Sequence, residues 1–163
     1  MQISHDDFLL FIDRALDGML RIVEELGNER ANRRPDLPGA NSPYVILTHC
    51  VGVAHYWIGA LLAHRHIPRD RDAEFRAQGT VDDIRRVVRT LQRQLREDLS
   101  HVRGEQPLVS APAASYTPLR GYEGWTQGAA LLHAYEELAQ HHGQMELTRD
   151  MLMQASTAGS PAS

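Results

Sequence analysis

The stretch AYEELAQHHGQMELTRD, residues 134–150, places a carboxylate and an imidazole in a run of strongly helical character. Glu137 and His141 are four residues apart, so their side chains are neighbours on one face of a helix. At about 100° per residue, His141 lies beside the apolar line of this segment, and Glu137 flanks that line one turn earlier. The apolar line consists of Leu131, Leu138, Met145 and Leu152. Two groups that bind cations therefore border the expected core.

A second histidine points to the same interior from the segment NSPYVILTHCVGVAHYW, residues 41–57. A lone histidine such as His49 on an apolar helix face is usually a hydrogen-bonded core residue. A carboxylate at the interior, however, requires a cationic partner. The chain has no lysine, and no arginine lies on its inner apolar stripes. A metal ion bound by His49, Glu137 and His141 satisfies all three groups.

Three protein ligands with one open position are typical of a catalytic zinc site, so we expect Zn²⁺, with Ni²⁺ as the alternative in purified protein. His133 precedes His141 by a rise of about 12 Å, too far for one ion on a straight helix. We expect His133 to line the pocket or to act as a base. His142 points about 100° away from His141 and is the second candidate base. Cys50 turns away from His49 and is expected to be a small core residue.

Four segments show helical periodicity, and none shows the alternation of a strand. Ser4, Ser42 and Thr80 are the expected N-terminal caps. The expected helices run from Ser4 to Gly27, from Ser42 to about His64, from Thr80 to about Val102 and from about Gly124 to Met153, with residues 104–123 as a crossover. The sequence predicts an all-α four-helix bundle with long crossover connections. We expect one domain over residues 1–153 and a disordered tail over residues 154–163.

The charge balance argues against a polyanionic partner, because 17 Lys+Arg and 21 Asp+Glu give a net charge of −4. Cys50 is the only cysteine, which excludes a disulfide framework and a Cys-rich zinc site. The start MQISHDDF lacks the features of a signal peptide, and no apolar run is long enough to span a bilayer. We therefore expect a cytoplasmic protein without membrane or nucleic-acid partners.

Three segments together resemble the DinB-like four-helix-bundle superfamily, in particular its thiol S-transferase branch: NSPYVILTHCVGVAHYW, HIPRDRDAEFRAQGTVDDI and EELAQHHGQ. The resemblance covers nearly the whole chain. It implies a bundle that holds a divalent metal, usually zinc, through one histidine on the second helix and two ligands four residues apart on the last. The mycothiol-dependent branch uses Glu-x-x-x-His in the last helix, which implies His49, Glu137 and His141 as ligands here.

The resemblance also implies the chemistry, in which a metal-activated low-molecular-weight thiol such as mycothiol attacks a small electrophile. Maleylpyruvate isomerase members of that branch carry an additional C-terminal domain. This chain ends soon after the last expected helix, so we expect thiol transfer rather than isomerisation. The alternative is a non-catalytic, divalent-metal-binding DinB-like protein of the stress response, which would use the same ligands.

Other surface features suggest alternatives. Nucleic-acid binding would use the arginines of residues 80–103, but six Arg against four acidic residues give an excess of only two, which favours a solvated helix face. The arginines of PRDRDAEFR, residues 68–76, either bind cosubstrate carboxylates or form a solvated, self-paired charged loop. Helix two has a second apolar face, which indicates a homodimer interface or burial under the crossover. That face consists of Leu47, Val51, Ile58 and Leu62.

Overall fold

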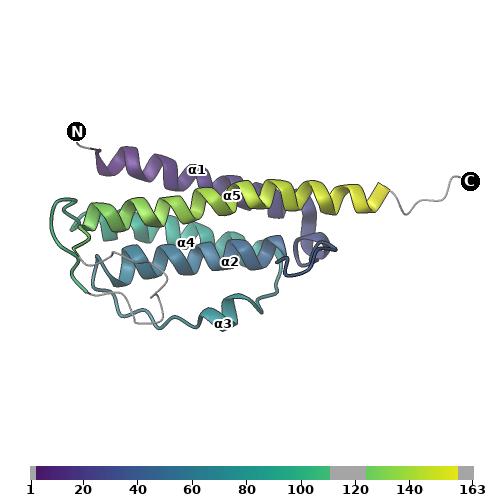
Figure 1. Cartoon of the computed structure of the whole chain (residues 1–163), viewed down its shortest axis with the longest axis horizontal. Helices are drawn as coiled ribbons and strands as arrows, with labels where there is room; N and C mark the ends of the chain where they lie inside the picture. The colour runs from purple at the N-terminus through teal and green to yellow at the C-terminus, as the bar shows by residue number, and fades with distance from the viewer. Residues whose placement is uncertain (1–2, 111–123, 158–163) are drawn as a thin grey trace, which may run out of the picture.

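Long helices build the protein, as the computed structural model in Figure 1 shows. The structure describes residues 3–110 and 124–157. Its elements are α1 (His5–Ala31), α2 (Pro43–Ala54), the π-helix η1 (His55–Ala60), α3 (Arg71–Glu74), α4 (Val81–Leu99) and α5 (Gln127–Thr157). α1, α2, α4 and α5 pack along one another, and η1 extends α2. The described residues form no strand, which confirms the prediction of an all-α bundle.

The predicted N-terminal caps begin α2, which carries His49, and the helices α1 and α4, which pack against it. The Ser42 hydroxyl accepts a hydrogen bond from the backbone N–H of Val45 at 3.3 Å and so caps α2. Thr80 and Asp83 form a complete capping box at the start of α4, and Ser4 caps α1. These caps fix where each helix starts, and with it the face that each later residue occupies.

Several helix boundaries differ from the prediction. Gly27 has a φ of 67°, which breaks the helical path of α1 before the helix resumes. The second helix changes from α to π geometry and ends at Ala60. α5 continues to Thr157, so the predicted tail begins too early, and the remainder of that tail lies outside the described residues. The same is true of residues 111–123 of the predicted crossover.

A short helix, α3, lies in the charged segment of residues 68–76, for which a solvated, self-paired loop and binding of cosubstrate carboxylates were the two alternatives. This segment runs beside α2 (Figure 1), and the two helices are in contact. The Asp70 carboxylate caps α3 by accepting the N–H of Ala73 at 2.9 Å. Glu74 at its end is buried. The prediction of a solvated loop is therefore wrong for the inner side of this segment, although its charges are indeed paired with one another.

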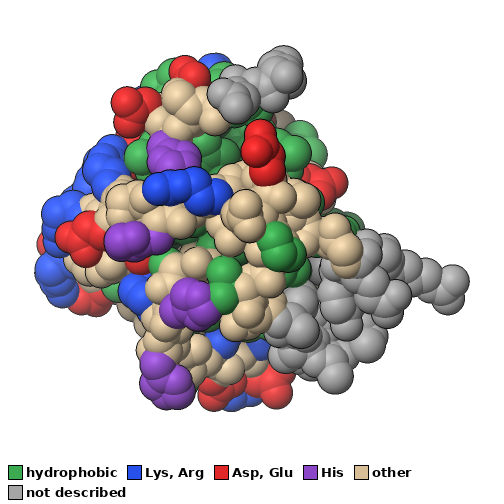
Figure 2. All heavy atoms as spheres, turned by 90° about the vertical axis from the view of Figure 1, so that its left-hand side faces the viewer, with side chains coloured by type: hydrophobic (Ala, Val, Ile, Leu, Met, Phe, Trp, Pro, Cys, Tyr) green, Lys and Arg blue, Asp and Glu red, His purple; other side chains and the backbone are tan. Residues whose placement is uncertain are grey.

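The arginines of α4 form ion pairs with acidic residues of α1. The pairs are Arg85 with Glu24 at 2.8 Å, Arg89 with Asp17 at 2.6 Å and Arg96 with Asp13 at 2.5 Å. This helix face is exposed to solvent, as predicted, and three of its arginines also pair with α1, which offsets much of their positive charge. Figure 2 shows one end of the bundle, where basic, acidic and histidine side chains are interspersed. These observations do not favour a nucleic-acid partner.

The second apolar face of helix two is buried within the chain. Leu47, Val51, Ile58 and Leu62 are all buried, because α2 contacts α1, α3, α4 and α5, and η1 contacts α4 and α5. This face is covered by other helices of the same chain, which is neither the homodimer interface nor the burial under the crossover that the sequence suggested. Within the part of the chain that is described, no helix combines the length and apolar character needed to cross a membrane.

Candidate metal centre

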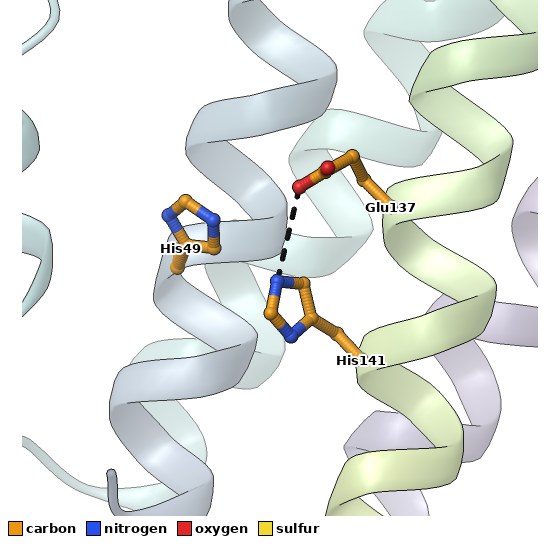
Figure 3. Close-up of side chains that lie close together, drawn as sticks. All are labelled: His49, Glu137 and His141. Carbon is orange, nitrogen blue, oxygen red and sulfur yellow. Dashed lines mark ion pairs between the residues drawn. The ribbon is translucent and has the colours of Figure 1, made fainter. Parts of the chain in front are cut away.

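The three predicted ligands lie together between α2 and α5 (Figure 3). His49 comes from α2, and Glu137 and His141 come from consecutive turns of α5. One ligand atom of each residue lies within 4.8 Å of those of the other two. His49 is buried, whereas the side chains of Glu137 and His141 are 32% and 28% exposed. The cluster is therefore anchored in the core at α2 and accessible to solvent beside α5.

Each histidine of the cluster has one ring nitrogen engaged in a hydrogen bond. Nδ1 of His49 lies 2.9 Å from Oε2 of Glu74, and Nδ1 of His141 lies 2.8 Å from Oε1 of Gln144. A carboxylate oxygen and an amide oxygen only accept hydrogen bonds, so each Nδ1 donates. In a neutral ring, Nε2 then keeps its lone pair, which is the form of histidine that binds a metal ion.

The donor set and its spacing fit a divalent metal ion. Zinc bonds of about 2.0–2.2 Å in a tetrahedral arrangement place ligand atoms about 3.4 Å apart. Nε2 of His141 lies 3.8 Å from Oε2 of Glu137, so small side-chain rotations reach that spacing. Two imidazoles and one carboxylate are also the ligand types that zinc takes in catalytic sites. The partly exposed side chains of Glu137 and His141 keep the cluster accessible to solvent.

Glu74 occupies its place beside His49 because of Arg69 and Gly52. Arg69 donates from Nε to Oε1 of Glu74 at 2.6 Å and from Nη2 to Oε2 at 2.9 Å. Burial raises the pKa of Glu74, but the hydrogen bonds from Arg69 and His49 outweigh burial and hold this pKa below its usual value. A Cβ at Gly52 would lie 2.1 Å from Oε1 of Glu74, so this position provides the space for the carboxylate.

Aromatic rings confine the His49 imidazole further. The ring of Phe75, the residue after Glu74, lies with its centroid 5.0 Å from that of His49. The His141 ring meets His49 edge to face at 5.1 Å. The guanidinium of Arg71 lies over the Phe75 ring, 5.6 Å from its centroid. The segment that contains α3 therefore contacts His49 both at Nδ1 and at the ring.

His133, a predicted pocket residue and candidate base, lies outside the three-ligand cluster. It is buried one turn before Glu137, and its ring contacts those of Trp57 at 4.7 Å and Trp125 at 5.5 Å. Its Nδ1 lies 3.5 Å from a carboxylate oxygen of Glu136. His133 thus belongs to an aromatic cluster on the side of α5 that faces η1.

His142, the second candidate base, faces a different helix. A Cβ at Gly18 of α1 would lie 2.2 Å from Nε2 of His142, so the imidazole packs directly over this glycine. The structure therefore brings His141 and not His142 into the cluster, as predicted from the helical wheel. Cys50 is fully buried, and its pKa is raised mainly by burial and then by Glu137 and Glu74, as suits a core residue rather than a ligand.

Sequence reasoning missed Glu74. The segment PRDRDAEFR contains Asp70, Asp72 and Glu74 at short intervals, and no helical period distinguishes the one that turns inward. The available signal is Gly52, which follows His49 by three residues and leaves a gap on the same face of α2. A gap of this kind indicates that a side chain from elsewhere approaches, without identifying which one.

Comparisons with known proteins agree with the fold and with the family resemblance seen in the sequence. The model of a family described as mycothiol-S-transferase matches residues 7–154. A crystal structure described as the conserved protein of locus from Enterococcus faecalis has a TM-score of 0.70 and 15% identity, over 94% of this chain and 99% of that one. At this identity the likeness concerns the fold alone. No curated protein matches the chain. Since the family model spans most of the sequence and confirms the resemblance, the chain belongs to the mycothiol-S-transferase family.

Proposed function

We propose that the protein transfers a low-molecular-weight thiol, such as mycothiol, to a small electrophile at a metal centre formed by His49, Glu137 and His141. Membership of the mycothiol-S-transferase family supports the reaction class. The observation that carries the metal centre is the convergence of three ligand atoms within 4.8 Å, on a side of α5 that solvent reaches. Zn²⁺ is the expected ion from the donor set, with Ni²⁺ as the alternative.

A bound zinc ion would supply Lewis acidity, which lowers the pKa of a coordinated thiol to the neutral range or below. Glu137 contributes one negative charge to the centre and the two neutral imidazoles contribute none, so the ligand set favours one further anion beside a divalent cation. The exposed edge formed by Glu137 and His141 admits the thiol and the electrophile. The thiol proton would pass to solvent or to a base, and the thiol sulfur would form a bond to the electrophilic carbon. In a substitution that carbon would release its leaving group as an anion, and in an addition to a double bond the displaced π electron pair would take up a proton.

Of the two candidate bases, His133 fits this proposal better. It lies one turn from Glu137, and its ring packs against Trp57 of η1, on the side of α5 that faces the α2–η1 helix. His142 packs over Gly18 of α1 instead. We therefore propose His133 as pocket lining and base.

Thiol conjugation of a model electrophile tests the proposed function directly. We expect conjugation above the uncatalysed rate with the metal-loaded protein, and its loss with a chelator or in His49→Ala, because the ligand set is then incomplete. His101→Ala, which changes an exposed histidine, is the control and should retain full activity. Activity indifferent to both the chelator and His49→Ala contradicts the proposal.

In the same assay His133→Asn should reduce the rate more than His142→Asn.

The alternative function is metal binding without catalysis, because the same ligands serve both. A protein that binds zinc tightly but conjugates no thiol across a screen of thiols and electrophiles supports this alternative. Metal analysis of the protein as purified distinguishes zinc from nickel. The cytoplasmic location remains a prediction from the sequence, to be tested by cell fractionation. The homodimer also remains a prediction, although the apolar face of helix two that suggested it is buried within the chain, and light scattering tests it.

A further inference from the structure

We propose that Glu74 is a positioning residue of the metal centre, which fixes His49 with its proton on Nδ1 and its lone pair on Nε2. This inference rests on the proposed function and adds a residue outside the ligand set. Glu74 comes from α3, an element that supplies none of the three ligands. Its side chain is nevertheless buried, and its Oε2 lies 2.9 Å from Nδ1 of His49.

The hydrogen bond selects one of two forms of His49. A neutral imidazole carries its proton on either nitrogen, and only the form with a bare Nε2 offers that atom to a metal. A carboxylate accepts and does not donate, so Glu74 stabilises the proton on Nδ1 of His49. The same hydrogen bond holds the His49 ring in one orientation. Nε2 then points in a fixed direction toward the place where a metal ion would bind.

Arg69 keeps the carboxylate of Glu74 in this acceptor role. Its two hydrogen bonds, at 2.6 Å and 2.9 Å, reach both carboxylate oxygens and restrict rotation of the group. The Arg69 charge also balances that of Glu74, so Glu74 orients His49 without adding net negative charge beside Glu137. Gly52 leaves the space into which the carboxylate fits.

The competing interpretation is that Glu74 and Arg69 only attach the α3 segment to the bundle. The protein contains a pair of that kind for comparison, in which the guanidinium of Arg65 contacts the buried Asp98 of α4 at 2.8 Å. This pair joins His55 rather than a ligand of the cluster. Asp98 is therefore a control, since its removal also takes a buried carboxylate from an ion pair with arginine but leaves Nδ1 of His49 bonded.

Zinc affinity, measured by competition with a chromophoric chelator, separates the two interpretations. We expect Glu74→Ala to bind Zn²⁺ about 10- to 100-fold more weakly than wild type, the usual effect of losing a partner of a metal-binding histidine. Glu74→Gln should recover part of this loss, because its amide oxygen still accepts from Nδ1. Asp98→Ala should keep wild-type affinity. Equal affinities of Glu74→Ala and wild type overturn the proposal, as do equal losses in Glu74→Ala and Asp98→Ala.

Nitrogen-15 NMR of histidine-labelled, metal-free protein measures the tautomer itself. We expect the Nδ1–H form of His49 in wild type and Asp98→Ala, and a mixture of forms in Glu74→Ala. An unchanged tautomer in Glu74→Ala overturns the proposal. This measurement needs no bound metal, so it tests the role of Glu74 separately from zinc binding. If the wild-type protein fails to bind zinc, that result contradicts the proposed function and not the role of Glu74.

Two glycine substitutions provide a second test in case the Glu74→Ala protein does not fold. Gly52→Ala leaves Glu74 intact but crowds its carboxylate, since the new Cβ would lie 2.1 Å from Oε1. Gly59→Ala creates a comparable crowding at Arg65, where the new Cβ would lie 2.4 Å from Nη2. We expect Gly52→Ala to weaken Zn²⁺ binding and disturb the His49 tautomer while Gly59→Ala changes neither. The same affinity and tautomer in the two folded variants overturns the proposal.

Discussion

At the scale of the residue, Glu137 is the ligand that supplies charge to the proposed centre. Glu137→Gln keeps the size of the side chain but removes the negative charge that binds a divalent cation. We expect its zinc affinity to fall by more than the roughly 10- to 100-fold typical of outer-shell changes. Competition with a chromophoric chelator measures this. Glu136→Gln is the control, because Glu136 is the adjacent carboxylate, is 61% exposed and lies outside the cluster.

If Glu137→Gln binds zinc as tightly as wild type does, Glu137 is not a ligand and the cluster has been misinterpreted. A loss of the same size in Glu136→Gln points instead to the general charge of α5. The two variants differ by one position and carry the same change in charge, so the comparison isolates the direction in which the side chain points.

The cluster of His49, Glu137 and His141 could be predicted from the sequence because helical geometry brings these residues together. Four-residue spacing places Glu137 and His141 together, and the wheel of α2 turns His49 inward, without any knowledge of how the helices pack. Glu74 could not be predicted in this way. Its position depends on a connection without a regular period, and on Arg69 and Gly52, which meet only in the folded chain.

At the scale of the element, α1 and α5 approach closely where His142 packs over Gly18. Gly18→Ala should destabilise the protein by up to about 2 kcal/mol, because overpacking costs about 1–3 kcal/mol and alanine regains about 1 kcal/mol of helix propensity. In a His142→Ala background the clash is absent, so the same substitution should stabilise by about 1 kcal/mol. Urea unfolding of the four proteins measures both effects.

Gly143→Ala is the control for helix propensity, because a Cβ there would meet no atom within 4 Å. It should stabilise by about 1 kcal/mol in either background. If Gly18→Ala has the same effect with and without His142, the imidazole does not pack over Gly18 in solution.

The sequence predicted the helices better than it predicted which helices contact one another. Three helix starts could be predicted because capping is local. The ion-pair partners of the α4 arginines could not be predicted, because they are 61, 72 and 83 residues away, on α1. The apolar face of helix two was ambiguous for the same reason, since burial by another helix and burial by a second chain leave the same sequence pattern.

At the scale of the whole molecule, a bound metal would connect α2 to α5, which lie far apart in the chain. An ion that binds only the folded state stabilises it by about 2.7 kcal/mol when its free concentration is 100 times Kd. For a protein of this size each kcal/mol raises Tm by about 2–4 °C, so we expect a rise of about 5–10 °C. Circular dichroism during heating, with zinc or with a chelator, measures this shift. His49→Ala should show no such rise, because the connection from α2 is then lost. An equal rise in wild type and His49→Ala would mean that zinc stabilises the fold from another site.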